Sequence, residues 1–478
     1  MTMKIHKSPI KLYASAKSVI NNYLFLPGKD RVSHIVKRVE SMSDEEVAGC
    51  MQRLMKEFGH RHRNITGSFL NHFHLTEIKF AIGLSHFSEQ QKILLGAFLT
   101  KEYSIQSAAL FNPSIVPHPN QDGLEPGEQR FVMSLRATGE GHISSIAFQT
   151  GVFTNKGVIR LDEHPEFYTC LQKNENAVYT KAFIRARAAV HAGFHEIALK
   201  ILPESFTASQ AMDILSLQKY DPAIKFCTDI IEEIFDTNYE LKDSSSLVLN
   251  EKVIFPSAKG ECMGMEDVRF VKFEHGDHSC YYGTYTAYDG KKIRTQLIET
   301  TDFNTFKTRT LFGEAIADKG MALLPEKVNG KYVMISRQGG ENISIMFSED
   351  LYKWDAYKTL MTPKYSWELV QLGNCGSPIK TEKGWLLLTH GVGLMRKYVI
   401  SAILLDPKDP SKIIGRLDKP FLEADETERE GYVPNVVYTC GLLRHGNVLL
   451  IPYAVSDSAT GFITVWLNEL LEELAISN

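Results

Sequence analysis

Two adjacent carboxylates and a guanidinium lie together in the segment 264–269 (GMEDVR), directly before the β-rich run 270–273. A carboxyl group in a cleft can act as a general acid, and a like charge beside it raises its pKa. Because neighbours in a strand alternate between its faces, Glu266 and Asp267 are predicted to point in opposite directions, with Arg269 on the side of Asp267. A surface glutamate beside a structural Asp–Arg pair is the alternative interpretation.

The elements that must position these residues are predominantly β-strands. From residue 111 the chain consists of short β-rich runs separated by Gly, Asp and Asn, such as 131–135, 281–286, 331–336 and 384–389. The segment 300–306 (TTDFNTF) recurs 48 positions later as 348–354 (SEDLYKW), each in a turn predicted to follow a strand. A period of roughly 40–50 residues is typical of propeller blades, although periodicity alone leaves a sandwich or barrel equally open.

Helices are predicted in two other parts of the chain. Capping boxes at 43–46 and 88–91 precede helically spaced apolar residues, and the second helix is expected to run from about 89 to about 110. A second helical block starts with a helix over 181 to about 202, followed by a capping box at 207–210 and an N-cap at Asp221-Pro222. The resulting division is an N-terminal helical region over 1–110 and a β domain over 111–470, with a helical insertion over 165–238.

The composition excludes several classes of protein. The 478 residues carry 53 Lys and Arg against 57 Asp and Glu, a net charge of -4, with a pI near 6.5. Such a balance offers no clustered positive field, so neither nucleic acid nor an anionic membrane surface is expected as a partner. The seven cysteines are scattered and never form a C-x-x-C pair, and no apolar leader or membrane span is evident, which favours a reducing cytoplasm.

An ordered series of motifs surrounds the GMEDVR segment. It is followed by 281–289, 319–330, 373–385, 389–392, 404–410 and 431–441, and is preceded by 111–113 (FNP) and 135–137 (LRA). This order resembles glycoside hydrolase family 130, the β-mannoside phosphorylases and β-mannosidases built on a five-bladed β-propeller. The resemblance covers about 110–465 apart from the insertion. The chain departs from it in Val268, where the family usually has Pro, in the insertion and in the N-terminal helices.

The resemblance implies an axial pocket that holds a terminal β-mannosyl unit. Asp267 matches the family's acid, which protonates the leaving oxygen through a hydroxyl of the sugar. The residues implied to bind the mannose are Asn112, Arg136 and Asp457, together with Glu266 and Arg269 of the same motif. For phosphate, Lys319 and His390 match the family's lysine and histidine, and Arg294 is the nearest candidate for its arginine. Taken singly, Lys319 could be a solvated turn lysine and His390 a strand-end histidine bonded to backbone.

Three functions follow from these residues. The first is an inverting β-mannoside phosphorylase, which uses inorganic phosphate to release α-mannose 1-phosphate from a short β-1,2- or β-1,4-linked oligosaccharide and needs no other cofactor. The second is an inverting β-mannosidase, which needs a second carboxylate as base, with Glu368 or Glu428 as candidates. The third is a catalytically silent propeller that binds glycans.

Metal binding is not expected, although 60–63 (HRHR) and 72–74 (HFH) have suitable side chains, because no further ligands follow at a matching spacing. The basic tetrad 60–63 is predicted to close a helix or to reach the cleft. The N-terminal helices carry apolar stripes, which must be buried against another surface. A homo-oligomer formed through these helices is therefore expected.

Overall fold

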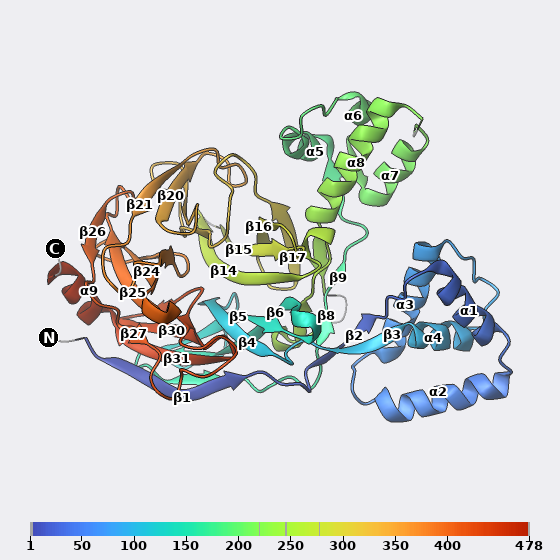
Figure 1. Ribbon diagram of the computed structural model, residues 1–478, viewed down its shortest axis with the longest axis horizontal. Helices are drawn as coiled ribbons and strands as arrows, with labels where there is room; N and C mark the ends of the chain where they lie inside the picture. The colour runs from blue at the N-terminus through green and yellow to red at the C-terminus, as the bar shows by residue number, and fades with distance from the viewer. Residues whose placement is uncertain (1–2, 219, 244–245, 277, 477–478) are drawn as a thin grey trace.

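The computed structural model of the chain describes residues 3–218, 220–243, 246–276 and 278–476. Strands form one large body, and two helical units extend from the same side of it (Figure 1). The prediction of a mainly β protein with helices near the N-terminus and in an insertion is confirmed. Among the described residues, no helix is both long and apolar enough to span a bilayer.

The β body consists of five successive groups of antiparallel strands. The first group contains β4 (Ala109–Pro117), β5 (Glu128–Thr138), β6 (Ser144–Thr154) and β7 (Ile159–Leu161), with β13 (Lys252–Ile254) and β8 (Thr169–Cys170) at its side. The second contains β14 (Gly264–His275), β15 (His278–Tyr288), β16 (Ile293–Thr300), β17 (Thr305–Thr310), β12 (Glu240–Lys242) and β9 (Gln172–Lys173). One parallel pairing, between Gly264 and Ser144, joins these two groups into one sheet.

The remaining groups follow in chain order. The third contains β18 (Ala322–Leu323), β19 (Tyr332–Ser336), β20 (Ile343–Ser348) and β21 (Tyr357–Met361). The fourth contains β22 (Gln371–Asn374), β23 (Ile379–Lys380), β24 (Trp385–Val392), β25 (Tyr398–Leu405), β26 (Ile413–Arg416) and β27 (Leu422–Glu423). The fifth contains β28 (Val437–Tyr438), β29 (Leu443–His445), β30 (Val448–Val455), β31 (Ala459–Trp466) and β1 (Ile5–Tyr13), and α9 (Leu467–Ile476) follows it.

The apolar core lies between neighbouring groups rather than at one centre. Separate buried clusters join the first group to the second, the second to the third, the third to the fourth, the fourth to the fifth, and the fifth back to the first. Each group therefore buries both of its faces against a neighbour, which a single twisted sheet exposed to water on one side would not do. The five-bladed arrangement itself stays a prediction.

The repeat seen in the sequence occupies equivalent turns. The segment 300–306 joins β16 to β17, and 348–354 follows β20. In each turn the aspartate, Asp302 or Asp350, accepts hydrogen bonds from backbone N–H groups two or three residues later. Phe306 and Trp354, the last residue of each copy, are fully buried. The prediction that both copies lie in turns after strands is confirmed.

The N-terminal helical unit contains α1 (Lys29–Glu40), α2 (Asp44–Phe58), α3 (Ile65–Phe80) and α4 (Glu89–Phe98). The capping boxes at Ser43 and Ser88 are present as predicted. The helix expected to reach about residue 110 ends at Phe98, because the chain turns into β3 (Thr100–Ser104), which pairs with β2 (Val19–Tyr23). The first residues are not helical either, since β1 pairs with β31 near the other end of the chain.

The insertion contains β10 (Val178–Thr180), α5 (Lys181–Ala188), α6 (Ile197–Ile201), β11 (Ser205–Thr207), α7 (Ala208–Ser216) and α8 (Pro222–Thr237). The helix predicted over 181–202 is broken into α5 and α6, with Gly193 between them at a φ of +85°, which a continuous helix cannot accommodate. The capping box at Thr207 and the Asp221 N-cap are present as predicted.

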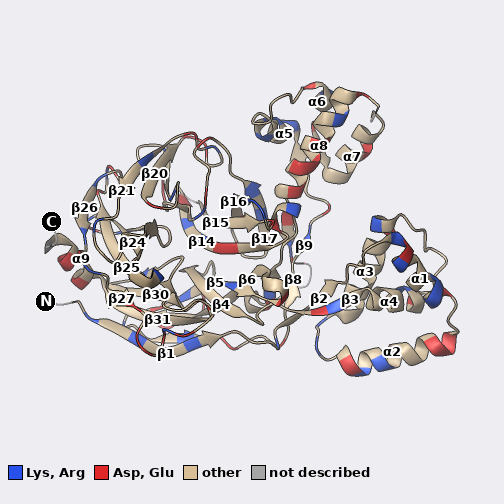
Figure 2. Ribbon diagram, viewed as in Figure 1, with Lys and Arg blue, Asp and Glu red and all other residues tan. Residues whose placement is uncertain are grey.

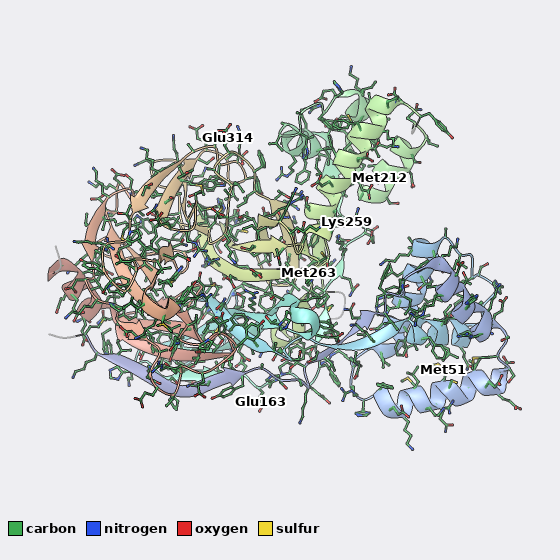
Figure 3. All side chains as sticks on the ribbon, in the orientation of Figure 1. Met51, Glu163, Met212, Lys259, Met263 and Glu314 are labelled. Atoms are coloured by element: carbon green, nitrogen blue, oxygen red, sulfur yellow. The ribbon has the colours of Figure 1, made fainter. Side chains whose placement is uncertain are left out.

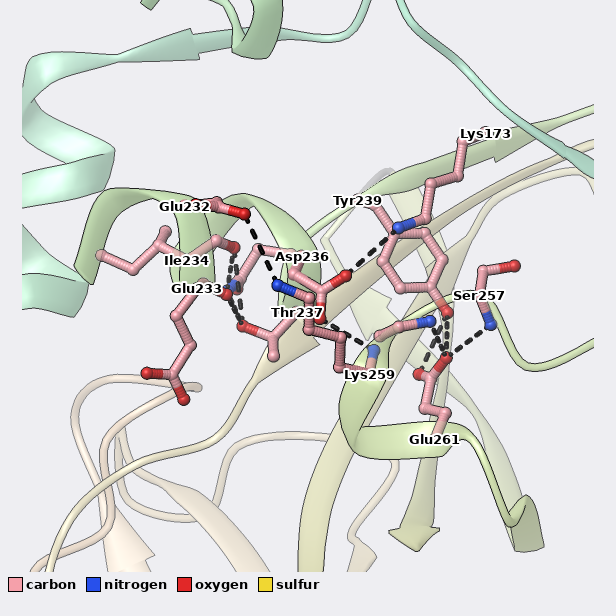
Figure 4. Close-up of polar contacts among 12 residues, drawn as sticks. Lys173, Glu232, Glu233, Ile234, Asp236, Thr237, Tyr239, Ser257, Lys259 and Glu261 are labelled. Carbon is pink, nitrogen blue, oxygen red and sulfur yellow. Dashed lines mark hydrogen bonds and ion pairs between the residues drawn. The ribbon is translucent and has the colours of Figure 1, made fainter. Parts of the chain in front are cut away.

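A buried carboxylate, Glu261, holds the chain where it returns from α8 of the insertion to the β body (Figure 4). Glu261 accepts hydrogen bonds from the hydroxyls of Tyr239, at 2.9 Å, and Tyr285, at 2.5 Å. It also accepts from the backbone N–H groups of Ser257 and Ala258, each at 3.0 Å. Because the side chain is fully buried, none of these donors has water as a ready substitute.

Glu261→Ala is therefore expected to lower the free energy of unfolding by about 3 kcal/mol or more, because it leaves several buried donors unpaired. The control is Glu232→Ala, which removes only an exposed contact to Lys259 at 3.5 Å and should cost less than about 1 kcal/mol. Denaturant unfolding of both variants and the parent tests this. Equal small losses would contradict the proposed anchoring role.

Candidate functional site

A small pocket of about 140 Å³ lies where residues of all five strand groups converge. Its lining contains several of the predicted site residues together with other cations and two tyrosines: Asn112, Arg136, Asp267, Lys319, Arg337, Arg396, Tyr398, Val436, Tyr438 and Asp457. Of the residues predicted from the sequence, the pocket therefore brings together Asn112, Arg136, Asp267, Lys319 and Asp457.

Three of these polar side chains come from positions with left-handed backbone. Asn112, Asp267 and Asp457 have φ values of +48°, +54° and +50°. The first two lie at irregularities in the pairing of β4 with β5 and of β14 with β15. Such conformations cost non-glycine residues about 1–3 kcal/mol each, and they cluster at functional sites. The strain here turns three polar side chains toward one pocket.

Arg136 contacts both carboxylates of the GMEDVR segment. Its Nη1 donates to Oδ1 of Asp267 at 3.2 Å, and its Nη2 donates to Oε1 of Glu266 at 2.7 Å. The prediction that Glu266 and Asp267 point to opposite faces is therefore wrong, because the bulge at Asp267 interrupts the strand alternation. Asn112 Nδ2 also donates to Asp267 Oδ1, at 2.7 Å.

Arg269 lies behind the pocket rather than in its lining. Its Nε donates to the carbonyl of Cys375 at 3.0 Å, its Nη1 to the carbonyl of Asp267 at 2.9 Å and its Nη2 to the Tyr438 hydroxyl at 2.6 Å. The side chain is buried, and protein atoms already occupy these donors. The prediction of direct substrate contact is thus corrected, since Arg269 holds the backbone of Asp267. Glu266 lies beside the pocket, held by Arg136 and by Lys319 at 3.5 Å.

A cationic group flanks Asp267. Lys319 and Arg337 line the pocket, and Arg337 Nη1 lies 3.3 Å from Nε2 of the buried His390. Burial and the charges of Arg337 and Arg269 hold the pKa of His390 well below its usual value, so the ring is neutral. Gly373 permits this arrangement, because a Cβ there would lie 2.4 Å from His390 Cε1 and 2.9 Å from Arg337 Cδ.

Arg337 occupies the place in the pocket that was expected of Arg294. Arg294 lies on β16, two strands outward from β14, and its Nη1 donates to Glu233 Oε1 at 2.9 Å. It lines a different cavity, so its predicted position in the phosphate site is wrong. Sequence reasoning missed Arg337. This residue directly follows the buried strand β19 and precedes Gly339-Gly340, a glycine pair that could have indicated a turn at the edge of the sheet.

Several buried polar atoms near the pocket have no hydrogen-bond partner among the described residues. They are Asn112 Oδ1, Arg337 Nε, His390 Nδ1 and both amide atoms of Asn374. Buried polar atoms in proteins are nearly always satisfied. These atoms therefore suit a polar ligand with several oxygen atoms. Asn374, which pairs with Thr389 beside His390, was not among the predicted site residues.

The two pocket carboxylates have opposite protonation behaviour. Burial acts to raise the pKa of Asp267, but the charges of Arg136, Arg269 and Lys319 outweigh it and lower that pKa to about 2. Burial and the negative charge of Asp267 raise the pKa of Asp457 to about 6. At neutral pH Asp267 is ionised without ligand, so the expectation that the free site raises the pKa of its acid is wrong.

The other predicted candidates lie outside the pocket lining. Glu368 is fully buried and accepts from Arg416 and from the backbone N–H of Lys364 and Tyr365. Glu428 is equally buried and pairs with Lys7 at 2.7 Å and the Tyr453 hydroxyl at 2.6 Å. These contacts place both glutamates in structural networks.

The basic tetrad 60–63 does not reach the cleft. Arg61 and His62 contact Glu102, and Arg63 contacts Glu251, so the tetrad ties the N-terminal helical unit to the β body. Within the described ranges, no group of three or more His, Cys, Asp or Glu side chains is arranged to hold a metal ion.

Comparison with known proteins agrees with this site chemistry. The family model for glycoside hydrolase family 130, described as beta-1,4-mannooligosaccharide phosphorylase, matches residues 232–475, about half of the chain. A 1,2-beta-oligomannan phosphorylase of Thermoanaerobacter sp. (strain X514) is 33% identical over 227 residues, covering 46% of this chain and 75% of the relative. A beta-1,2-mannobiose phosphorylase of the same organism is 33% identical over 267 residues, covering 54% and 84%.

A solved structure is also similar. The beta-1,2-mannobiose phosphorylase from Listeria innocua, in complex with beta-1,2-mannobiose, has a TM-score of 0.47 and 21% identity, covering 77% of this chain and 92% of that one.

The opposed pKa values of the two aspartates predict a specific pH dependence. Asp457 ionises near pH 3.8 in the unfolded chain but near pH 6 in the folded one, so its contribution to stability is lost as the pH rises through 4 to 6. Asp457→Asn should therefore gain roughly 2–3 kcal/mol relative to the parent between pH 4 and 7. Unfolding free energies of both proteins across this range test it, and parallel pH profiles would contradict it.

Proposed function

Because the chain belongs to glycoside hydrolase family 130, we propose that it is an inverting β-mannoside phosphorylase. It uses inorganic phosphate to release α-mannose 1-phosphate from the non-reducing end of short β-manno-oligosaccharides. The observation that carries this proposal is the placement of the cations Lys319 and Arg337 in one pocket with Asp267, with the neutral ring of His390 in contact with Arg337. A phosphorylase needs such a cationic cradle, since its nucleophile is an anion that requires no base.

In this mechanism Asn112, Arg136 and Asp457 hold the terminal mannosyl unit by hydrogen bonds. A phosphate oxygen forms a bond to the anomeric carbon while the bond to the leaving oxygen breaks. The leaving oxygen takes a proton that comes from the Asp267 carboxyl through a hydroxyl of the sugar. Asp267 then regains its proton from solvent before the next turnover.

The protonation of Asp267 is coupled to phosphate binding. In the free site three cations keep Asp267 ionised, and Lys319 is one of them. A phosphate dianion bound by Lys319 and Arg337 compensates that positive charge and adds a like charge beside the carboxylate. Both effects raise the pKa of Asp267. Phosphate binding therefore favours the protonated form of Asp267, the form that donates the proton.

In the hydrolase alternative, neither glutamate considered as the base lies in the pocket lining. Glu368 and Glu428 are buried in structural networks outside the pocket lining. An inverting hydrolase needs a second carboxylate with room for water, about 6.5–9.5 Å from the acid. The cation group would also serve no purpose in such an enzyme, which favours phosphorolysis.

We also propose that the five strand groups are the blades of a five-bladed β-propeller over 111–470, with 165–238 as an insertion whose first strands, β8 and β9, pair with strands of the blades. The five clusters that link the groups in a cycle support this arrangement. A second hollow, lined from the same five groups by Ile115, Phe270, Pro325, Ser377 and Leu442 among others, supports an axis with two open ends. The proposed active site would then lie at one end.

The reaction is assigned to the cytoplasm. All seven cysteines are free, including the buried Cys375 and Cys440, which agrees with a reducing compartment. A charged sugar phosphate formed there would be retained by the membrane.

The N-terminal helical unit is proposed to join two copies of the chain through α2. This helix buries only Val47 completely, whereas Met55 and Phe58 of the same apolar stripe are 41% and 36% exposed. Met51, labelled in Figure 3, belongs to this stripe as well. Acidic residues occupy the first turn of α2, whereas Arg53, Lys56 and Glu57 lie in or near its last turn, so both signs of charge occur at that end in Figure 2. An antiparallel pair of α2 helices would place opposite charges together.

The direct test of the proposed function is product identification. With β-1,2-mannobiose and phosphate, the protein should form mannose 1-phosphate, and omission of phosphate should stop turnover. We expect β-1,2-mannobiose to react faster than β-1,4-mannobiose, because both Thermoanaerobacter relatives are named for 1,2 linkages. Free mannose formed equally well without phosphate would refute the phosphorylase.

Asp267→Asn should lower turnover by at least about 100-fold, because the amide keeps the shape but cannot deliver a proton. The variant should also lose roughly 2 kcal/mol of stability at neutral pH, because the surrounding cations stabilise the ionised Asp267. Near-normal activity of this variant would eliminate both enzymatic interpretations of the pocket and leave the glycan-binding protein.

Lys319→Ala and Arg337→Ala should each raise the KM for phosphate by roughly 10- to 100-fold, because each removes a charge-assisted contact worth about 1.5–3 kcal/mol. The KM for the mannoside should change less. Arg160→Ala is the control, since this exposed arginine lies on β7, outside the pocket lining, and its ion pair among the described residues is with Glu128. An unchanged KM for phosphate in both pocket variants would contradict the proposal that Lys319 and Arg337 bind phosphate.

The α2 contact is tested by light scattering at several concentrations. Met55→Asp places a charge on the exposed stripe and should convert a dimer to a monomer. Gly49→Asp should not, because it lies on the exposed opposite side of the helix, where an added Cβ meets nothing within 4 Å. A parent protein that is monomeric at all concentrations would contradict this assignment.

A further inference from the structure

A second cavity, of about 300 Å³, lies between the helical insertion and the outer strands of the second group. Helices α5 and α8 form one wall, and β16, β17 and the loop 316–318 form the other. Asp318 lines this cavity while its neighbour Lys319 lines the proposed active site. The two cavities are thus separate, with a single loop between them.

Arg187 is the feature of this cavity that lacks an explanation. Its side chain is stacked between two rings, with its Cζ 3.9 Å from the Phe183 centroid and 4.7 Å from the Tyr352 centroid. The residue is only 8% exposed. Its Nε donates to Asn238 Oδ1 at 3.4 Å, and within the described part of the chain neither Nη atom has a hydrogen-bond partner.

No carboxylate of the described residues lies within ion-pair distance of Arg187. Burial lowers its pKa from the usual value of arginine, but the guanidinium remains charged. Arg309 adds a second positive charge, since its Cζ lies 5.3 Å from the same Phe183 ring. Buried charges in proteins are normally paired, because desolvation of an unpaired ion is costly. Arg187 is thus a buried cation without its anion.

The carboxylates that line the cavity are already engaged. Glu233, labelled in Figure 4, accepts from Arg294 Nη1 at 2.9 Å. Asp318 Oδ2 accepts from the backbone N–H of Gly339 at 2.6 Å. Neither forms an ion pair with Arg187. Glu299 and Asp350 act on its guanidinium only from beyond ion-pair distance, and the charge of Arg309 opposes them.

We propose that this cavity binds a small phosphorylated sugar, with its phosphate on the Nη atoms of Arg187. The planar fork of an arginine side chain matches the oxygen atoms of phosphate in a bidentate contact. The volume is at the lower end of the roughly 300–1000 Å³ typical of small-molecule sites, which fits one sugar unit. The remaining lining combines hydroxyl and apolar groups, as a sugar body requires: Thr237, Thr295, Thr310, Ile234, Ile293 and Leu311.

The test is a binding titration of the full chain with inorganic phosphate and, separately, with mannose 1-phosphate. We expect two sites per chain for mannose 1-phosphate in the parent. Arg187→Met should lose one site, Arg337→Ala should lose or weaken the other, and Arg185→Gln should keep both. Arg185 is the matched control, because it lies on the same helix but is exposed and pairs with Glu196. Tighter binding of inorganic phosphate than of the sugar phosphate at the Arg187 site would overturn the sugar assignment.

Thermal melting is the second measurement, and it shows whether the Arg187→Met variant is folded. Since an unpaired buried charge is unfavourable, Arg187→Met should melt at the same temperature as the parent or higher without ligand, and mannose 1-phosphate should then stabilise it less. A lower melting temperature together with unchanged anion binding would show that Arg187 is structural and would overturn the proposal.

These outcomes separate this inference from the proposed function. A single site that disappears in Arg337→Ala and persists in Arg187→Met refutes the second site while leaving the phosphorylase intact. A site that disappears only in Arg187→Met supports the second cavity even if the first pocket does not use phosphate.

Discussion

The guanidinium of Arg136 is the contact on which the geometry of the pocket depends. It holds Glu266 and Asp267 at once, and these carboxylates come from adjacent positions that an ordinary strand would turn to opposite faces. The left-handed backbone at Asp267 makes the double contact possible. Arg269 then fixes that backbone from behind through the Asp267 carbonyl. Arg136 therefore sets the direction of the acid and, together with Arg269 and Lys319, its ionised state.

Half of the pocket lining was predicted, because the ordered motifs resemble those of a known family whose site residues they match. Asn112, Arg136, Asp267 and Lys319 were all predicted, and all line the same cavity. The orientation of Asp267 could not be predicted, because a bulge depends on pairing with a distant strand rather than on local residue types. Arg337 was missed and Arg294 wrongly preferred for the same reason, since their distance from the pocket is decided by strand order.

In the fold as well, features set by neighbouring residues were predicted correctly, whereas features set by pairing with distant strands were not. Capping boxes at Ser43, Ser88 and Thr207 marked helix starts correctly, because the signal lies within four residues. Helix ends were less predictable. The helix that begins at Glu89 stops at Phe98 because the next residues pair with β2, about 80 positions earlier in the chain. Strand β1 was not predicted at all, since its partner β31 lies near the opposite end of the chain.

Phosphate binding is proposed to load Asp267 with its proton, and the whole mechanism depends on this step. The most direct measurement follows the Asp267 carboxyl carbon by ¹³C NMR through a pH titration, with and without saturating phosphate, using Asp267→Asn to assign the signal. The free protein should show a pKa near 2, and phosphate should raise it. A pKa that is the same in both titrations would contradict the account, because the acid would then be independent of the nucleophile.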